Sequence, residues 1–92
     1  MRDRDPSVRL AAAQALGQLG DPQAIPALLQ ALGEGNAAVR RTAAEALGQL
    51  GDPQAIPALT QALGDQNDAV RRTAAEALGQ LRDPQAIPAL LQ

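Results

Sequence analysis

The side chains of this 92-residue chain that could carry chemistry form two Arg-Glu pairs with the same spacing. Arg41 precedes Glu45 by four residues, and Arg72 precedes Glu76 by the same interval. If Glu45 and Glu76 lie on adjacent parallel helices, one could act as a general acid and the other as a general base. That chemistry needs one carboxyl group with a raised pKa, whereas an arginine one turn away favours the ionised form of each glutamate. We therefore expect no acid-base catalysis from these residues.

Other catalytic and metal-binding groups are scarce. The chain has no His and no Cys, so no hydroxyl has a histidine base and no thiolate ligand exists. Residues 65–68, Asp-Gln-Asn-Asp, faintly resemble a calcium loop but lack its glycine and its bidentate glutamate. We predict no catalytic residue, no metal site and no cofactor. The hydroxyl side chains are those of Ser7, Thr42, Thr60 and Thr73.

An internal repeat defines the elements that position these side chains. Residues 21–51 recur as residues 52–82 with five changes, and residues 83–92 repeat the first ten positions of the same unit. Residues 1–20 match the last twenty positions of that unit at ten places. A period of 31 residues indicates a solenoid whose units bury their apolar faces against neighbouring units.

Each unit has signals for two helices. Asn36 is suited to cap a helix whose apolar positions recur with a period of 3.6, and Gly51 is suited to end it in the left-handed conformation. Pro26 should make the first turn of the other helix irregular. Arg82 replaces the terminal glycine, so that turn either differs or is strained. We predict a single all-α domain over residues 1–92, an alpha-solenoid of three helix pairs, with helices at about 6–19, 22–32, 37–50, 53–63, 68–81 and 84–92.

Composition and charge limit the function further. The apolar share is 46% without any aromatic residue, and the net charge is −2 with a pI near 4.8. This balance gives no general attraction to nucleic acid or to anionic membranes, and no apolar run is long enough to span a bilayer. We expect a soluble protein, cytoplasmic if it is natural. The absence of Lys, His, Cys and aromatics, together with the near-identity of the units, favours a consensus design over a recent duplication.

The sequence pattern DPQAIPAL…ALG…AVRRTAAEALGQLG resembles the HEAT-like repeats of the phycobilisome-lyase type. It also resembles idealised HEAT units from artificial libraries. The resemblance covers essentially the whole chain. It implies that the helix beginning near Asp21 lies on the convex side and that the helix beginning near Asn36 lines a concave groove. Metal-binding enzymes with such repeats use His-Glu pairs, which a chain without His cannot supply. A role toward a pigment protein, or in DNA binding, remains an alternative implied by this resemblance.

A protein partner on the concave face would meet residues opposite the apolar stripe of a helical wheel. The alternative interpretation is that the Arg-Glu pairs are solvated, each contributing about 0.2 to 0.5 kcal/mol. Arg40 and Arg71, on the flank of the wheel, are expected to reach loop aspartates such as Asp52, Asp65 or Asp68 and to tie neighbouring units together. The predicted groove residues are Arg41, Ala44, Glu45, Gly48, Arg72, Ala75, Glu76 and Gly79.

The two ends of the chain predict self-association. The chain opens on the second helix of a pair and closes on the first helix of another, so a head-to-tail homo-oligomer would continue the solenoid. Leu10 also stands where later units have Arg41 and Arg72. The alternatives are that the chain was cut from a longer array, or that Leu10 is a tolerated surface leucine. The residues expected to take part are Val8, Leu10, Leu16, Ile87, Leu90 and Leu91.

Overall fold

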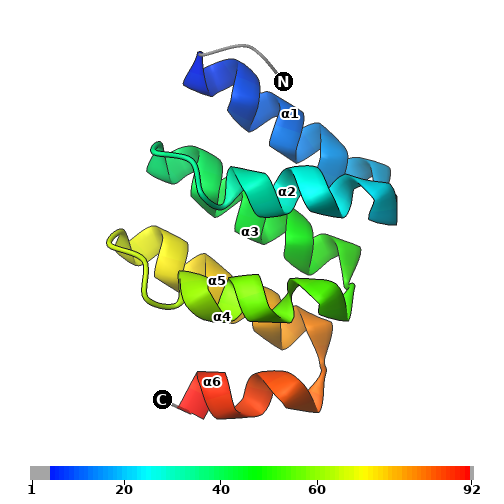
Figure 1. The fold of residues 1–92 in the computed structure, drawn as a ribbon, viewed down its shortest axis with the longest axis vertical. Coiled ribbons are helices and arrows are strands. Elements are labelled where there is room, and N and C mark those ends of the chain that lie inside the picture. The colour runs from blue at the N-terminus through cyan, green and yellow to red at the C-terminus, as the bar shows by residue number, and fades with distance from the viewer. Residues whose placement is uncertain (1–4, 92) are drawn as a thin grey trace.

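Two layers of helices build the molecule, as the computed structural model shows for residues 5–91 (Figure 1). No strand and no helix long and apolar enough to cross a bilayer occurs within these residues. The Cα atoms extend over 37 × 28 × 15 Å, and the shortest dimension fits two layers of helix. One layer holds α1 (Pro6–Leu19), α3 (Ala37–Leu50) and α5 (Asp68–Leu81), and the other holds α2 (Ile25–Ala31), α4 (Ile56–Ala62) and α6 (Ile87–Leu91). This confirms the predicted all-α solenoid of three helix pairs.

The three long helices begin and end at the capping residues. The side chain of Asn36 accepts hydrogen bonds from two backbone amides of α3 at 2.9 and 3.2 Å, and Asn67 does the same for α5. Gly20 and Gly51 follow α1 and α3 in the left-handed conformation, with φ of 68° and 69°. Arg82 adopts the same conformation after α5, with φ of 55°. The turn after α5 therefore keeps the glycine geometry without a glycine.

Each short helix is preceded by a 3-10 turn: η1 (Pro22–Ala24), η2 (Pro53–Ala55) and η3 (Pro84–Ala86). Pro26 has no amide to bond to the carbonyl of Pro22, and the amide of Ile25 donates to that carbonyl instead. The irregular first turn expected from Pro26 is this 3-10 turn. Where the sequence predicted one helix over 22–32, the structure has η1 and then α2, which ends at Ala31.

Small residues allow the long helices to approach closely. A Cβ atom built on Gly17 of α1 would lie 2.7 Å from the Cβ of Ala46 in α3. One built on Gly48 of α3 would lie 2.9 Å from the Cβ of Ala77 in α5. Real Cβ atoms do not approach so closely, so each contact requires a glycine. The largest fully buried side chains are those of Ile25, Leu28, Leu47, Leu59, Leu78, Val39, Val70 and Thr42.

Candidate functional site

The predicted protein-binding groove is only partly accessible on α3. Arg41 is half-buried and Glu45 is exposed, but Ala44 and Gly48 are buried. The prediction that Ala44 and Gly48 face a ligand is therefore wrong, because α5 packs against this side of α3. The helical wheel placed both residues opposite the apolar stripe, where alanine and glycine fit solvent and a helix contact equally well.

The equivalent positions on α5 have a different environment. Arg72, Glu76 and Gly79 are exposed, and Ala75 is half-buried. No described helix lies beyond α5 in its layer (Figure 1). The eight predicted residues therefore do not form one continuous groove. Ala44 and Gly48 lie in the buried contact between α3 and α5, and the other six residues are exposed or half-buried.

The Arg-Glu ion pairs within one helix, which were the alternative interpretation of these residues, do not form in the described part of the chain. Within residues 5–91, the salt bridges join Arg9 to Glu34 and Arg40 to Asp65, and none joins Arg41 to Glu45. Arg72 and Glu76 are likewise unpaired with each other. Two long exposed side chains gain little from such a pair, because the loss of side-chain entropy offsets a weak attraction in water.

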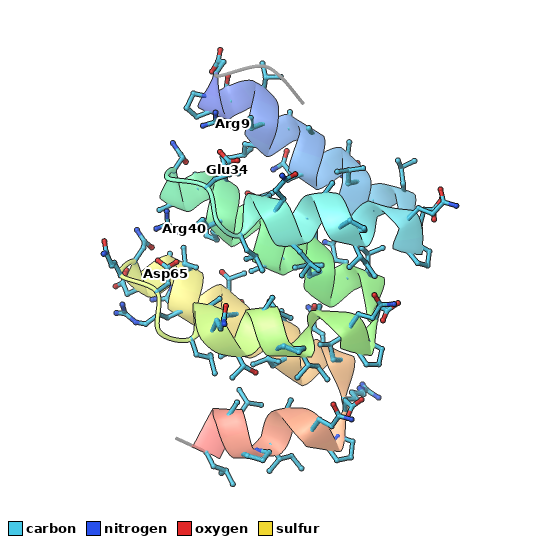
Figure 2. The ribbon with its side chains drawn as sticks, viewed as in Figure 1. Arg9, Glu34, Arg40 and Asp65 are labelled. Atoms are coloured by element: carbon cyan, nitrogen blue, oxygen red, sulfur yellow. The ribbon has the colours of Figure 1, made fainter. Side chains whose placement is uncertain are left out.

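The hydrogen bonds of Arg40 confirm the prediction that this arginine binds a loop aspartate and links neighbouring units. Its Nε and Nη2 atoms donate to the two carboxylate oxygens of Asp65 at 2.8 and 3.1 Å (Figure 2). Its Nη1 atom donates to the backbone carbonyls of Glu34 and Gly35 at 2.8 and 2.9 Å. These hydrogen bonds from Arg40 are the main reason why the pKa of the Asp65 carboxyl lies below its usual value. The loop before α5 is thereby fixed to α3.

The candidate metal ligands and hydroxyl side chains can be located in the described part of the chain. No three carboxylates, histidines or cysteines within residues 5–91 are grouped so as to hold a metal ion. Thr42 and Thr73 are buried, with 2% and 8% of their surface exposed. The hydroxyl of Thr60 donates to the carbonyl of Ile56 at 2.8 Å, one turn earlier in α4. The hydroxyls of Thr42 and Thr73 are therefore covered, whereas Thr60 is exposed and its hydroxyl proton is engaged within α4.

One open apolar surface lies on α1. We define the α1 face as Val8, Ala11, Ala15 and Leu19, which recur at helical spacing and are all exposed. Val8 is 43% exposed and Leu19 is 73% exposed. The equivalent residues one period later are largely covered. Val39 is 1% exposed, and the residues equivalent to Ala11 and Ala15 are Thr42 and Ala46, each 2% exposed.

A second open surface lies on α5 and α6. We define the α5–α6 face as Ala75, Gly79, Ile87 and Leu90. Ile87 is 53% exposed and Leu90 is 42% exposed, whereas the equivalent Ile56 and Leu59 of α4 are 5% and 0% exposed. A groove of about 440 Å³ lies on this side of the molecule. It is lined by Thr60, Leu63, Gly64, Ala75, Ala89 and Leu90.

These two faces match the two sides of a contact that already occurs twice inside the molecule. Gly17 meets Ala46, and Gly48 meets Ala77. The next glycine in this series is Gly79, beside which a Cβ atom would meet nothing within 4 Å. The alanine that precedes the series is Ala15 of the α1 face. The α5–α6 face therefore has the glycine side of this contact, and the α1 face has the alanine side.

The predicted self-association residues differ in how well they fit these faces. Val8, Ile87 and Leu90 belong to them, whereas Leu16 is half-buried and already packs against the core. Leu10 is half-buried. Leu91 is 82% exposed, but it occupies the position of Thr60, which is also exposed in an inner unit. The sequence prediction missed Ala11, Ala15 and Leu19, although the repeat register aligns Ala15 with the alanines of both inner contacts.

Comparisons with known proteins agree with this architecture. The family model of HEAT repeats matches the chain over residues 1–66 and again over residues 26–92. The structure is similar to a chain in the complex of CpcE and CpcF of phycocyanin lyase from Nostoc sp. PCC7120, with a TM-score of 0.89 and 37% sequence identity. The match covers 98% of this chain and 37% of that chain, so this chain spans little more than a third of that neighbour. A search of curated proteins finds no match.

Proposed function

The chain belongs to the HEAT repeat family, and we propose that it is a non-catalytic scaffold whose α5–α6 face binds the α1 face of another copy. The observation that carries this proposal is the match between the open faces and the inner contacts. The glycine side of the contact is open on α5, and the alanine side is open on α1. Joining them would repeat the packing of α3 against α5 across a boundary between two copies.

The second layer would gain a matching contact. In the inner units, the first helix of each pair is covered by the long helix that follows it, and Ile56 and Leu59 of α4 are buried in this way. Ile87 and Leu90 of α6 are the equivalent residues and are about half exposed. An α1 helix from another copy, placed beside α5, would cover them as α5 covers α4. Head-to-tail contacts of this kind give rings or open filaments.

The strength of the assembly follows from the apolar surface that it removes from water. Val8, Ile87 and Leu90 are about half exposed and Leu19 is 73% exposed, so burying the exposed part of each would contribute about 1 kcal/mol. Their sum of about 4 kcal/mol, with the smaller alanine contacts added, lies near the low end of the cost of association, about 4 to 15 kcal/mol. We therefore expect weak assembly that depends on concentration, and a dissociation constant of about 1 mM would require about 4 kcal/mol more from the remaining contacts between copies.

Two variants test this proposal through different faces. Gly79→Gln fills the position that an alanine of the next copy would approach, and Ala15→Arg places a charge on the α1 face. Both residues are exposed, so each variant should fold, as circular dichroism would show. We expect the mass from light scattering to rise above 9.5 kDa with concentration for the unmodified chain but to stay at 9.5 kDa for both variants. Glu76→Gln is the matched control, because this position is exposed on all three long helices.

Mixing the two variants tests the head-to-tail geometry. Ala15→Arg retains an intact α5–α6 face, and Gly79→Gln retains an intact α1 face. A one-to-one mixture should therefore form a dimer with twice the mass of 9.5 kDa and grow no further. A symmetric contact between two identical faces would not produce this result. An unmodified chain that stays monomeric up to millimolar concentration would overturn the proposal.

The similarity to the CpcE and CpcF complex supports a second candidate function. That neighbour belongs to a phycocyanin lyase and is a complex of two different proteins. By analogy, this chain would bind a pigment protein or a second HEAT repeat chain rather than a copy of itself. The test is titration of the chain with a phycocyanin subunit and its free bilin pigment, followed by absorbance. A shifted pigment spectrum together with a monomeric chain would favour this candidate over self-assembly.

A further inference from the structure

The short helices α2, α4 and α6 form one layer, and a groove of about 250 Å³ lies between α2 and α4 (Figure 1). On one side it is lined by residues of α2 and of the turn that follows, which are Leu29, Leu32 and Gly33. On the other side it is lined by residues of α4 and of the loop that follows, which are Ala58, Gln61, Ala62 and Asp65. This inner groove shows how successive short helices meet in the solenoid.

A wider groove of about 380 Å³ lies on the other side of α2. We call it the α2 groove. Four of its lining residues are the counterparts, one period earlier, of the α4 side of the inner groove: Ala27, Gln30, Ala31 and Glu34. No described helix precedes α2 in its layer, so nothing within residues 5–91 takes the place of Leu29 and Leu32. Residues of α1 such as Leu16 line the α2 groove instead.

The exposure of equivalent residues shows what a preceding short helix covers. Ala27 is exposed, whereas Ala58 and Ala89, whose helices each follow another short helix, are half-buried. Leu16 of α1 is half-buried, whereas its counterpart Leu47 lies on α3, against which α2 packs, and is 0% exposed. The α2 groove therefore lacks the covering that the inner units receive from the short helix before them.

The repeat register identifies a described side chain that would close this groove. Leu91 of α6 is the counterpart of Leu29 and is 82% exposed, more than any other large apolar side chain of residues 5–91. We propose that Leu91 of one copy inserts into the α2 groove of the next copy beside Ala27, as Leu29 shares the inner groove with Ala58. This inference rests on the proposed head-to-tail function, because α6 reaches α2 of another copy when α1 of that copy lies beside α5.

The α2 groove suits an apolar side chain better than a charged ligand. Arg9 and Glu34 both line it, and the Nε atom of Arg9 lies 3.3 Å from a carboxylate oxygen of Glu34 (Figure 2). The charge of Arg9 is therefore already matched by an acid. An exposed leucine gains by leaving water, and Leu29 occupies the same position in the inner groove and packs partly buried against the core. Leu91 would thus supply one of the further contacts that a weak assembly needs.

Shortening the side chain and blocking the groove test this contact from its two sides. Leu91→Thr gives α6 the residue that α4 has at this position, and Ala27→Gln fills part of the groove. Both positions are exposed, so both variants should fold, as circular dichroism would show. We expect each to raise the dissociation constant of the assembly about tenfold, measured by sedimentation. The matched control is Ala37→Gln, the same change at a position where α5 has Asp68, and it should change the constant less than twofold.

The combined variant shows whether the two residues belong to one contact. If Leu91 lies beside Ala27, both substitutions remove the same contact, so together they should weaken assembly little more than either does alone. Effects that multiply would overturn the inference. Weakening by only one of the two substitutions would also overturn it, because the other residue would then lie outside the contact.

Failure of this inference is distinguishable from failure of the proposed function. A chain that assembles, but whose dissociation constant changes with neither Leu91→Thr nor Ala27→Gln, would overturn the insertion of Leu91 and leave self-assembly standing. A chain that never assembles would overturn both. Weakening by both substitutions, without multiplication in the combined variant and with Ala37→Gln unchanged, is the result that the insertion of Leu91 predicts.

Discussion

Helices α3 and α5 have nearly the same sequence and different surroundings. Their fourteen residues differ only at the first position, Ala37 in α3 and Asp68 in α5. Gly48 of α3 is buried, and a Cβ atom there would lie 2.9 Å from Ala77. Gly79 of α5 is exposed, and a Cβ atom there would meet nothing within 4 Å. The burial of a residue in this solenoid is therefore set by the neighbouring helix and not by the sequence of its own helix.

This comparison explains why the open faces resemble an interface. A repeat that encodes a contact in one unit encodes it again in the next, whether or not a helix is present to receive it. Ala75 and Gly79 retain the small side chains that bring α3 and α5 together through Ala44 and Gly48. The α5–α6 face is thus a copy of an inner contact surface, which supports its assignment to binding another copy.

The largest expected effect is a difference between two identical substitutions on these helices. Gly48→Leu would force a side chain into the contact with α5 and should reduce the free energy of unfolding by about 3 kcal/mol or more. Gly79→Leu adds the same side chain where there is space. It should increase the free energy of unfolding by up to about 0.8 kcal/mol, because leucine favours the helix more than glycine does. Urea denaturation at low protein concentration measures both values.

Equal losses from the two substitutions would contradict this comparison, because they would mean that Gly79 is as closely packed as Gly48. Gly64 provides a control in a loop, since a Cβ atom there would meet only a carbonyl oxygen at 3.5 Å, an ordinary contact. Gly64→Leu should therefore change the free energy of unfolding far less than Gly48→Leu.

The sequence predicts the local elements of this fold better than its surfaces. Caps such as Asn36 and Gly51 depend on a few neighbouring residues, so they could be located from sequence, as could the inter-unit role of Arg40. Ala44 and Gly48 could not be placed on a surface, because small side chains suit solvent and a helix contact equally. Only the position of α5 distinguishes the two. The 3-10 turn before α2 forms because Pro26 has no amide to donate to the carbonyl of Pro22, which accepts from the amide of Ile25 instead. The sequence pattern indicated only that this turn is irregular.

A smaller effect concerns the ion pairs between units. Arg40 pairs with Asp65 of the next unit, whereas no carboxylate among the described residues lies within ion-pair distance of Arg71. Asp65→Asn should reduce the free energy of unfolding by about 2 kcal/mol at pH 7, because it removes charged hydrogen bonds from a half-buried arginine. The amide oxygen can still accept the hydrogen bond from the backbone amide of Asn67, so the loop retains its turn. Arg71→Gln should cost less, since it removes bonds to two carbonyls only.

The contribution of Asp65 should also depend on pH in a defined direction. Its pKa in the folded state is lowered from 3.8, chiefly by the bonds from Arg40. The stabilisation is therefore fully present above about pH 4 to 5 and is lost as the pH falls below 3.8 through the lower folded value. The difference between the unmodified chain and Asp65→Asn should shrink over this range in thermal unfolding. A difference that stays constant down to pH 2 would exclude the ion pair as its cause, and Glu76→Gln, at an exposed position, serves as the control.

The smallest effect comes from the turns after α3 and α5, where the geometry is shared and the residue differs. Gly51 and Arg82 both adopt the left-handed conformation, with φ of 69° and 55°. A side chain in this conformation places Cβ near the following carbonyl, at a cost of about 1 kcal/mol. Arg82→Gly should therefore raise the free energy of unfolding by about 1 kcal/mol, and Gly51→Arg should lower it by about the same amount. Both are measurable by urea denaturation.

These two substitutions test whether the strain is local to the turn. A Cβ atom at Gly51 would meet no atom within 4 Å, so crowding by other side chains cannot account for a loss in Gly51→Arg. If the backbone conformation alone is responsible, the double variant that exchanges the two residues should have the same stability as the unmodified chain. A net change in the exchanged chain would show that the turn after α5 differs in cost from the turn after α3. Because α6 is largely exposed whereas α4 is covered by α5, such a difference would arise from the freedom of α6 to relax.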